Sequence, residues 1–249
     1  YKRQDNDAPP PCDVLTNPRW APRLSTLTEL SLRNCGLKEL PKAIGRCASL
    51  KKLDLGGNDL IDLPPALATC AQLEILFVLG SRRMARVPKV LAKMTSLTRL
   101  GLKSNGLIVL EGGALPPHLI HAIFTDNAIE TIDEGAWRKF ASIRKLMLAN
   151  NKLTSFDGGA SPRTALASLE LVRLANNNLQ TLPDAVLKAP RLAWVALAGN
   201  SKLVGVGPLT SDLETTMAAI DFSDAVALGA GASGSVRSAF YAGTPCAVK

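Results

Sequence analysis

The sequence predicts an α/β solenoid, with a parallel β-sheet on the concave face and short helices, 3₁₀ turns and loops on the convex face. The frame L-x-x-L-x-L-x-x-C-x-L-x-x-L begins at Leu27 and returns 23 residues later, from Leu50. The composition agrees, because 47% of the residues are hydrophobic but only 4% are aromatic, which suits a core of stacked aliphatic side chains. A polar turn position also recurs in register. Copies of the frame begin at Leu27, Leu50, Leu73, Leu97, Leu119, Ile143, Leu169 and Leu192.

Each repeat is predicted to contain a short strand, a turn and a return limb. In the first repeat Leu30 and Leu32 alternate with more polar residues, so we expect the leucines to face the core. The turn position is Asn in most repeats, and Cys35 and Ser81 are the exceptions. A side-chain amide both donates and accepts, so stacked Asn residues can satisfy backbone groups of the turns. Apolar residues spaced by three after a Pro, as from Pro41, indicate a single helical or 3₁₀ turn.

Residues 27 to about 206 therefore resemble a leucine-rich repeat domain, mostly of the short type with Leu-Pro after the Asn turn. The resemblance implies a curved solenoid that recognises proteins. We expect a disordered segment or partial cap over residues 1–23, about eight repeats over residues 24–206, and a cap or linker over residues 207–220. Trp20 and Leu24 are candidates for the cap, because the first repeat otherwise exposes its stacking face.

The outward positions of the predicted strands carry apolar side chains that core packing does not explain. An exposed apolar patch flanked by Arg and Lys is a candidate protein-binding surface. The alternative is that segments outside this sequence cover some of these positions. The two histidines have no partner at metal-ligand spacing. The predicted surface consists of Ile75, Phe77, Leu79, Arg99, Lys103, His121, Ile123, Met147, Leu171, Arg173 and Trp194.

Charge and cysteine content limit the remaining functional classes. The net charge of +8 could favour acidic partners, but the basic residues are scattered and no nucleic-acid-binding module is visible, so we expect no nucleic acid. Five cysteines without C-x-x-C spacing predict neither a zinc site nor a disulfide framework. Cys35, Cys47 and Cys70 are interpreted as small buried hydrophobic residues. A bridge between the last two is sterically possible, but reduced thiols are expected. No apolar run is long enough to span a bilayer.

The period stops after Pro208, and a glycine-rich motif follows. Residues 229–236 read G-x-G-x-x-G-x-V after a strand-like run. A dinucleotide-binding turn also uses G-x-G-x-x-G, but it requires a helix directly after the glycines. Here residues 236–242 have the composition of a strand, and a Gly-Thr-Pro turn leads into Cys-Ala-Val-Lys at residues 246–249. The last four residues are similar to the V-A-I-K strand of protein kinases.

Residues 221–249 thus resemble the opening of a protein kinase N-lobe, and the I-D-F lead-in is most similar to the tyrosine-kinase-like group, which phosphorylates Ser or Thr. The resemblance implies that glycines cover the phosphates of ATP, that Leu228, Val236 and Ala247 line the adenine pocket, and that Lys249 pairs with the α- and β-phosphates. Ser233 departs from the aromatic residue that many kinases carry at the loop tip. The implied ATP site comprises Leu228, Gly229, Ala230, Gly231, Ala232, Ser233, Gly234, Ser235, Val236, Ala247 and Lys249.

Two functional hypotheses follow. The first is a fragment of a signalling protein kinase that joins a recognition domain to a truncated N-lobe, with Mg²⁺ expected in the full-length enzyme. No H-R-D or D-F-G motif is present in the 249 residues, so we expect no catalysis from this polypeptide. The second is a non-catalytic adaptor that binds a protein partner. Because no membrane span separates the repeats from the glycine motif and ATP is intracellular, we expect both segments to be cytoplasmic.

Overall fold

The computed structural model describes residues 12–160, 166–181 and 183–203, together with the backbone of strands between residues 220 and 248. The chain divides into two compact units, residues 1–203 and residues 204–249. The first unit contains the predicted repeats. The second unit is a small antiparallel sheet, and the two units are described separately.

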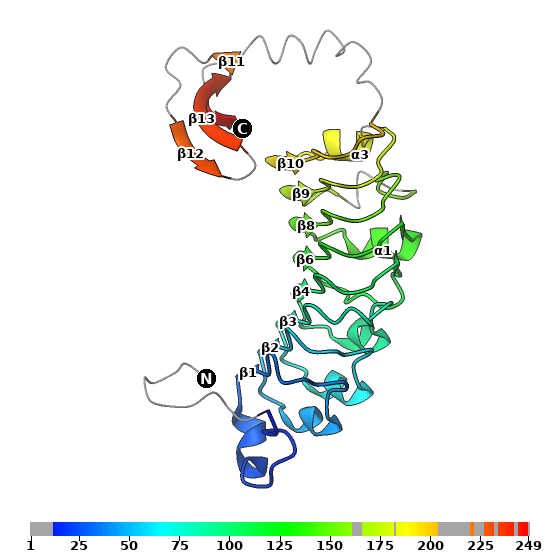
Figure 1. The fold of residues 1–249 in the computed structure, drawn as a ribbon, viewed down its shortest axis with the longest axis vertical. Coiled ribbons are helices and arrows are strands. Elements are labelled where there is room, and N and C mark those ends of the chain that lie inside the picture. Colours follow the sequence, from blue (N-terminus) through cyan, green and yellow to red (C-terminus); the bar gives the residue numbers. More distant parts are fainter. Residues whose placement is uncertain are drawn as a thin grey trace. The chain divides into compact units, whose positions relative to one another are not determined.

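One parallel sheet of eight strands runs through the first unit and confirms the predicted solenoid. The strand order is β1-β2-β3-β4-β6-β8-β9-β10, so each repeat adds its strand beside the strand of the repeat before it (Figure 1). Inward side chains pair in register, as Leu30 does with Leu53 and Leu53 with Leu76. The strands are β1 (Glu29–Ser31), β2 (Lys52–Asp54), β3 (Ile75–Phe77), β4 (Arg99–Gly101), β6 (His121–Ile123), β8 (Lys145–Met147), β9 (Leu171–Arg173) and β10 (Trp194–Ala196).

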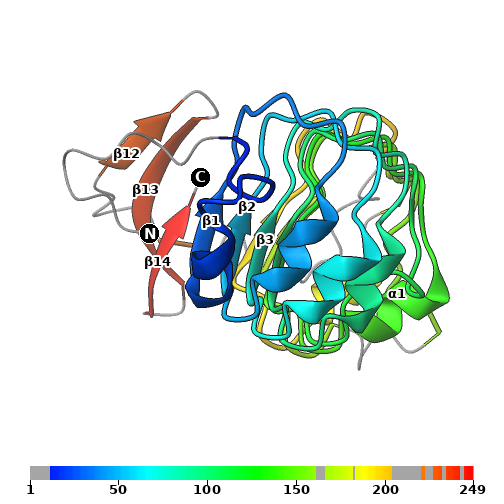
Figure 2. The same ribbon diagram turned by 90° about the horizontal axis from the view of Figure 1, so that it is seen from below.

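Short helical turns form the opposite layer of this unit (Figure 2). η2, η3, η4 and α3 each follow a proline, which fixes the backbone where the turn begins, whereas α1 follows Asp133. Each turn buries an apolar residue, such as Ile44 or Leu67. The two-residue strands β5 (Val109–Leu110) and β7 (Thr131–Ile132) form a separate two-stranded parallel sheet. The helical turns are η1 (Ala21–Thr26), η2 (Lys42–Arg46), η3 (Pro65–Thr69), η4 (Lys89–Lys93), α1 (Glu134–Lys139) and α3 (Asp184–Leu187).

The core between these layers is aliphatic except at α1. There Trp137 packs edge to face against Phe140 and Phe156, with ring centroids 6.0 and 4.9 Å away. The Asp133 side chain caps this helix by accepting a hydrogen bond from the Ala136 amide. The three aromatic side chains therefore fill the core beside α1.

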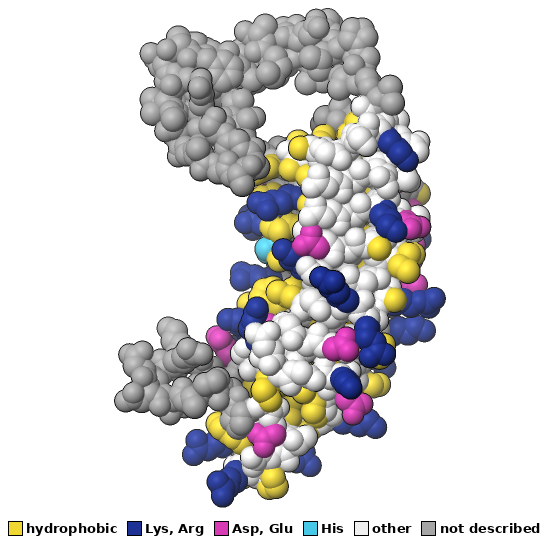
Figure 3. Space-filling view, in the orientation of Figure 1, with side chains coloured by type: hydrophobic (Ala, Val, Ile, Leu, Met, Phe, Trp, Pro, Cys, Tyr) yellow, Lys and Arg dark blue, Asp and Glu magenta, His cyan; other side chains and the backbone are white. Residues whose placement is uncertain are grey.

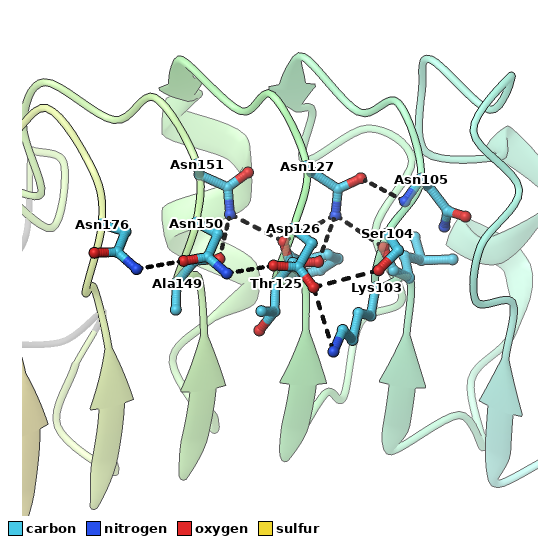
Figure 4. A network of polar contacts seen from close by, with 12 residues as sticks. Lys103, Ser104, Asn105, Thr125, Asp126, Asn127, Ala149, Asn150, Asn151 and Asn176 are labelled. Atoms are coloured by element: carbon cyan, nitrogen blue, oxygen red, sulfur yellow. Dashed lines mark hydrogen bonds and ion pairs between the residues drawn. The ribbon is translucent and has the colours of Figure 1, made fainter. Parts of the chain in front are cut away.

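The Asn positions form a hydrogen-bonded ladder along the turns. Asn127 shows the pattern: its Oδ1 accepts from the Asn105 and Leu107 amides at 3.1 and 3.2 Å, and its Nδ2 donates to the Leu102 and Phe124 carbonyls (Figure 4). Each amide thus links the turn of its own repeat to the preceding repeat. The predicted structural role of these residues is confirmed.

The residue before each ladder position adopts a left-handed backbone conformation, with φ between 53° and 82°. This conformation favours Gly and is tolerated by Asn, Asp and a few small polar residues, which accounts for the residue types found there. The side chains at four of these positions, Ser104, Asp126, Asn150 and Asn176, also hydrogen-bond to one another across the repeats (Figure 4). The eight residues are Asn34, Gly57, Gly80, Ser104, Asp126, Asn150, Asn176 and Gly199.

The N-terminal end of the unit corrects the prediction for Cys35. Cys35 is not a buried free thiol but forms a disulfide with Cys12, which joins the segment before η1 to the first turn. Leu15 and Leu24 are buried in the core beside the first repeat, and Trp20 packs against it. Residues 12–26 thus pack over the first repeat, whereas the sequence placed a disordered segment or partial cap over residues 1–23. Residues 1–11 lie outside the described part. Cys47 and Cys70 are buried free thiols, as expected.

The second unit is an antiparallel arrangement around one long strand. β13 (Gly234–Tyr241) pairs with β12 (Ala227–Gly231), with β14 (Thr244–Val248) and with the short β11 (Ile220–Asp221). The register between β12 and β13 shifts at residues 227–229. The order of three consecutive antiparallel strands agrees with the strands predicted around the glycine motif, and no helix follows Gly234 directly.

Candidate functional site

The outward side chains of the eight-stranded sheet form aligned columns, which we call the sheet face. Since neighbouring strands lie about 4.8 Å apart, residues in one column contact the residues before and after them. Figure 3 shows basic and apolar side chains gathered along the edge of the first unit where the strands of Figure 1 lie. The first column is Glu29, Lys52, Ile75, Arg99, His121, Lys145, Leu171 and Trp194, and the second is Ser31, Asp54, Phe77, Gly101, Ile123, Met147, Arg173 and Ala196. The predicted surface residues all lie in these columns except Leu79 and Lys103, which follow β3 and β4 at the next outward position.

An apolar group occupies the third repeat. Ile75, Phe77 and Leu79 are half-buried although they point away from the core. Their burial has a local cause, because a Cβ atom placed on Gly101 would lie 2.5 Å from Phe77 Cδ1 and 3.3 Å from Leu79 Cδ2. The Phe77 ring therefore rests on the backbone of β4, where only a glycine leaves room for it. Ile123 and Met147 continue the apolar second column beyond Gly101.

A cationic row crosses the centre of the first column. Arg99 on β4, His121 on β6 and Lys145 on β8 are consecutive in register. Both flanking cations are exposed, and neither has a carboxylate within ion-pair distance among the described residues. Lys145 was missed by the sequence prediction, although its outward position next to the inward Leu146 could have identified it. We call Arg99, His121 and Lys145 the cationic row.

His121 is the unusual member of the row. It is half-buried, and its Nε2 atom is buried without a hydrogen-bond partner among the described residues. Burial lowers the pKa of His121 below its ordinary value, and the positive charges of Lys145 and Arg99 lower this pKa further. The neutral imidazole therefore predominates at neutral pH. Such an unsatisfied polar atom is uncommon in a native structure and marks a place where a partner could supply the missing hydrogen bond.

Three other basic residues on or beside the sheet face form ion pairs within it. Lys52 pairs with Glu29 at 3.4 Å, and Arg33 pairs with Asp54 at 3.0 Å. Lys103 forms an ion pair with Asp126, the residue of the next repeat that has the left-handed backbone conformation.

That residue, Asp126, lies at the centre of a polar network (Figure 4). It accepts hydrogen bonds from Asn150 and Ser104 and forms an ion pair with Lys103 at 3.2 Å. The pKa of Asp126 is lowered, mainly by the Asn150 hydrogen bond and also by Lys103 and Ser104. Both carboxylate oxygens of Asp126 are thus engaged, and this carboxylate is a structural group.

The last described repeat presents an aromatic side chain. The Arg173 guanidinium carbon lies 5.5 Å from the centroid of the Trp194 ring, which is a cation–π distance. Trp194 is 47% exposed. An exposed tryptophan held by an arginine is a common anchor in protein interfaces.

The residues of the second predicted site, for ATP, are only partly described. Leu228, Gly229, Ala230 and Gly231 lie on β12, Gly234, Ser235 and Val236 lie on β13, and Ala247 lies on β14. Ala232, Ser233 and Lys249 fall outside the described residues, as do all side chains of this unit. The strand pairing brings the glycines of β12 and β13 to one hairpin, where Gly231 pairs with Gly234.

The described part of the chain contains no group of His, Cys, Asp and Glu side chains that could hold a metal ion. Among the same residues, helices are too short and too polar to cross a bilayer.

Known proteins resemble this chain through its repeats. A family model described as Leucine Rich Repeat matches residues 26–47 and 49–70. The two matches coincide with the first two copies of the predicted repeat. Podocan-like protein 1 of Homo sapiens is 30% identical over 108 residues, which cover 43% of this chain and 20% of that protein. Podocan of Mus musculus is 39% identical over 71 residues, which cover 28% of this chain and 11% of that protein. The matches thus span a fifth or less of the length of these relatives.

Solved structures share the fold of the leucine-rich repeat unit. A leucine-rich repeat protein of Leptospira interrogans superposes with a TM-score of 0.63 at 23% identity, over 74% of this chain and 52% of that one. The TLR13 chain of a TLR13–ssRNA13 complex superposes with a TM-score of 0.62 at 20% identity, over 75% of this chain and 30% of that one. These likenesses establish the solenoid. None of the comparisons supports a kinase domain.

Proposed function

We propose that this chain is a non-catalytic recognition module that binds a protein partner on the sheet face of its leucine-rich repeats. The observation that carries the proposal is the apolar second column, where Phe77, Ile123 and Met147 point outward from the core. Apolar side chains surrounded by charged ones are typical of the buried centre and polar rim of a protein interface. The relatives named above also match through their repeats, which favours the adaptor hypothesis over the kinase hypothesis.

The test compares proteins captured from cells by matched variants of the full chain. The sheet-face variant combines Phe77→Ser with Ile123→Ser. The control variant combines Ile61→Ser with Ile108→Ser, because these residues are 50% and 47% exposed but lie outside the eight-stranded sheet. Thermal unfolding first establishes that both variants are folded.

We expect the wild type and the control to retain the same specific protein and the sheet-face variant to lose it. Mass spectrometry identifies the retained proteins. If the sheet-face variant retains every protein that the wild type retains, the sheet face is not the binding surface and the proposal is wrong.

The protein kinase hypothesis is the second candidate, and the strand order of the second unit is the observation that favours it. A strand, a glycine hairpin and two further antiparallel strands are what the resemblance to a kinase N-lobe implies for residues 227–248. In that case ATP would bind at the glycines, and the full-length protein would require Mg²⁺ and work in the cytoplasm. The Cys12–Cys35 disulfide weighs against this hypothesis, because disulfides persist in oxidising compartments and are rare in the cytosol.

Nucleotide binding distinguishes the two candidates. Titration calorimetry of the full chain with ATP and Mg²⁺ should show little heat, and incubation with radiolabelled ATP and a general protein substrate should transfer no phosphate, because the sequence lacks the H-R-D and D-F-G motifs. Saturable ATP binding that Gly229→Val and Gly231→Val abolish would support the kinase hypothesis. Phosphate transfer would contradict the non-catalytic proposal.

A further inference from the structure

We infer that the partner presents an acidic, extended segment, in which Asp or Glu side chains alternate with apolar ones, to strands β4, β6 and β8 of the sheet face. This inference rests on the proposed function and specifies the chemistry of the partner. It follows from three features of the face: two cations that form no ion pair among the described residues, a buried nitrogen without a hydrogen-bond partner, and apolar neighbours on the adjoining column. The charge of Glu170 acts on Lys145, but its ion pair is with Arg144.

The unpaired cations are Arg99 and Lys145. Lys52 and Lys103 on the same face each have a carboxylate of the chain within 3.4 Å, and the Arg173 guanidinium lies over the Trp194 ring. Arg99 and Lys145 have none among the described residues, and like charges separated by a single strand repel each other. A carboxylate from outside the chain would relieve this repulsion, which gives the site charge complementarity to an acidic ligand.

His121 lies between the two cations and supplies a directional contact. Its Nε2 is buried without a hydrogen-bond partner among the described residues, so an oxygen can accept a hydrogen bond from it only where the side chains that cover the imidazole move aside. An acidic side chain placed over the row would lie between two cations. Strand spacing places Arg99 and Lys145 about 10 Å apart, a distance that a few residues of extended peptide bridge.

The apolar neighbours favour a peptide over a nucleic acid. Ile123 and Met147 lie beside the cationic row in the second column, and Ile75 and Phe77 lie on the next strand. An acidic peptide with alternating apolar residues can satisfy both columns. A nucleic acid backbone requires a continuous track of cations, whereas the row offers two exposed ones flanked by aliphatic side chains.

The experiment measures binding of a fluorescein-labelled peptide, in which Glu alternates with Leu, to the full chain by fluorescence anisotropy. The test variant combines Arg99→Gln with Lys145→Gln. The matched control combines Arg46→Gln with Lys93→Gln, which removes the same charge from exposed residues on η2 and η4. We expect the test variant to weaken binding at least about tenfold and the control to leave it unchanged. A peptide of alternating Gln and Leu should bind the wild type at least about tenfold more weakly than the Glu peptide.

Other outcomes overturn the inference. Equal affinity for the Glu and Gln peptides would show that the face does not select acidic chains. An equal loss in the control variant would show only long-range attraction by the net charge. Tighter binding of polyuridylate than of the Glu peptide, lost in the test variant, would assign the row to RNA. The capture experiment tests the proposed function separately. If Phe77→Ser with Ile123→Ser loses a partner that Arg99→Gln with Lys145→Gln still retains, the proposed function stands and the acidic ligand is refuted.

Discussion

The Asn ladder is the residue-scale feature on which the solenoid depends. Asn151 is nearly buried, donates from Nδ2 to the Phe124 and Leu148 carbonyls at 3.0 and 2.9 Å, and accepts from the Ile129 amide at 3.0 Å. Replacing its side chain with a methyl group leaves these backbone groups without partners. A buried unsatisfied group costs about 1–3 kcal/mol, so the loss exceeds that of an ordinary surface substitution.

We therefore predict that Asn151→Ala lowers the free energy of unfolding by about 2 kcal/mol. Urea unfolding monitored by circular dichroism measures it. The matched control is Asn178→Ala, because Asn178 is half-buried and its backbone amide, not its side chain, makes the hydrogen bond to Leu153. Equal effects of the two substitutions would show that the ladder contributes no special stability.

His121 gives the sheet face a pH dependence. Its pKa is lower in the folded protein than the ordinary value of 6.5, so the unfolded chain binds the proton more readily. Stability is therefore expected to fall as the pH decreases through the ordinary value, and His121→Gln removes this contribution. Urea unfolding at about pH 7.5 and about pH 5.5 should show a larger loss for the wild type than for His121→Gln. A loss of the same size in both proteins would mean that the imidazole protonates freely in the folded state.

The sequence predicted the ladder but not the details beside it. Asn at a fixed interval is visible in the sequence, and its role follows from the hydrogen-bonding capacity of an amide. The left-handed residue before it was not recognised, because Gly, Asn, Ser and Asp share that position and no single residue type repeats. Lys145 could have been identified from its outward position beside the inward Leu146. The buried nitrogen of His121 could not, because its burial depends on how neighbouring strands pack around it.

At the scale of elements, the N-terminal cap is held by a covalent bond. The Cys12–Cys35 disulfide joins residues 23 apart in sequence, and Cys35 replaces the Asn of the first turn. The Cys35 backbone amide still donates to Asn58 Oδ1 at 3.0 Å. The first side-chain amide of the ladder is therefore that of Asn58. In the first repeat the disulfide, instead of an Asn side chain, attaches the turn to the segment before it.

We predict that Cys12→Ser destabilises the leucine-rich repeat unit by about 3 kcal/mol, the entropy of closing a loop of this length in the unfolded chain. Urea unfolding measures the loss, and Cys47→Ala serves as a control because Cys47 is a free thiol. Reductant should destabilise the wild type by a similar amount and leave Cys12→Ser unaffected. A non-reducing peptide map that recovers Cys12 and Cys35 as unlinked peptides would contradict the prediction.

The disulfide could not be predicted from the sequence because Cys12 lies in a segment without any repeat period. The five cysteines include Cys47 and Cys70 at equivalent repeat positions, so the sequence suggested a possible disulfide only between these two. Stacking does place them in adjacent repeats, but Cys70 Sγ hydrogen-bonds to the Ile44 carbonyl at 3.3 Å and burial raises its pKa to about 11, with a smaller contribution from Cys47. A thiol so protonated is a poor nucleophile for disulfide formation.

At the scale of the whole molecule, the sequence predicted the repeats, but it predicted the function only as a general class. Periodicity determines the solenoid, because each unit buries its apolar face on the next. The sheet face could be located since outward positions alternate with inward ones along each strand. The kinase-like segment is different: its strands agree with the prediction, while ATP binding depends on side chains, Lys249 among them, that lie outside the described residues.

Site-specific photo-crosslinking in cells tests most directly whether the sheet face binds a protein. A photoreactive amino acid replaces Ile123 on the sheet face in one full-length variant and Ile61, outside the sheet, in the other. We predict a discrete crosslinked protein for the variant at residue 123, suppressed by Arg99→Gln with Lys145→Gln, and none for the variant at residue 61. Crosslinking of that protein at residue 61 but not at residue 123 would contradict the proposed binding surface.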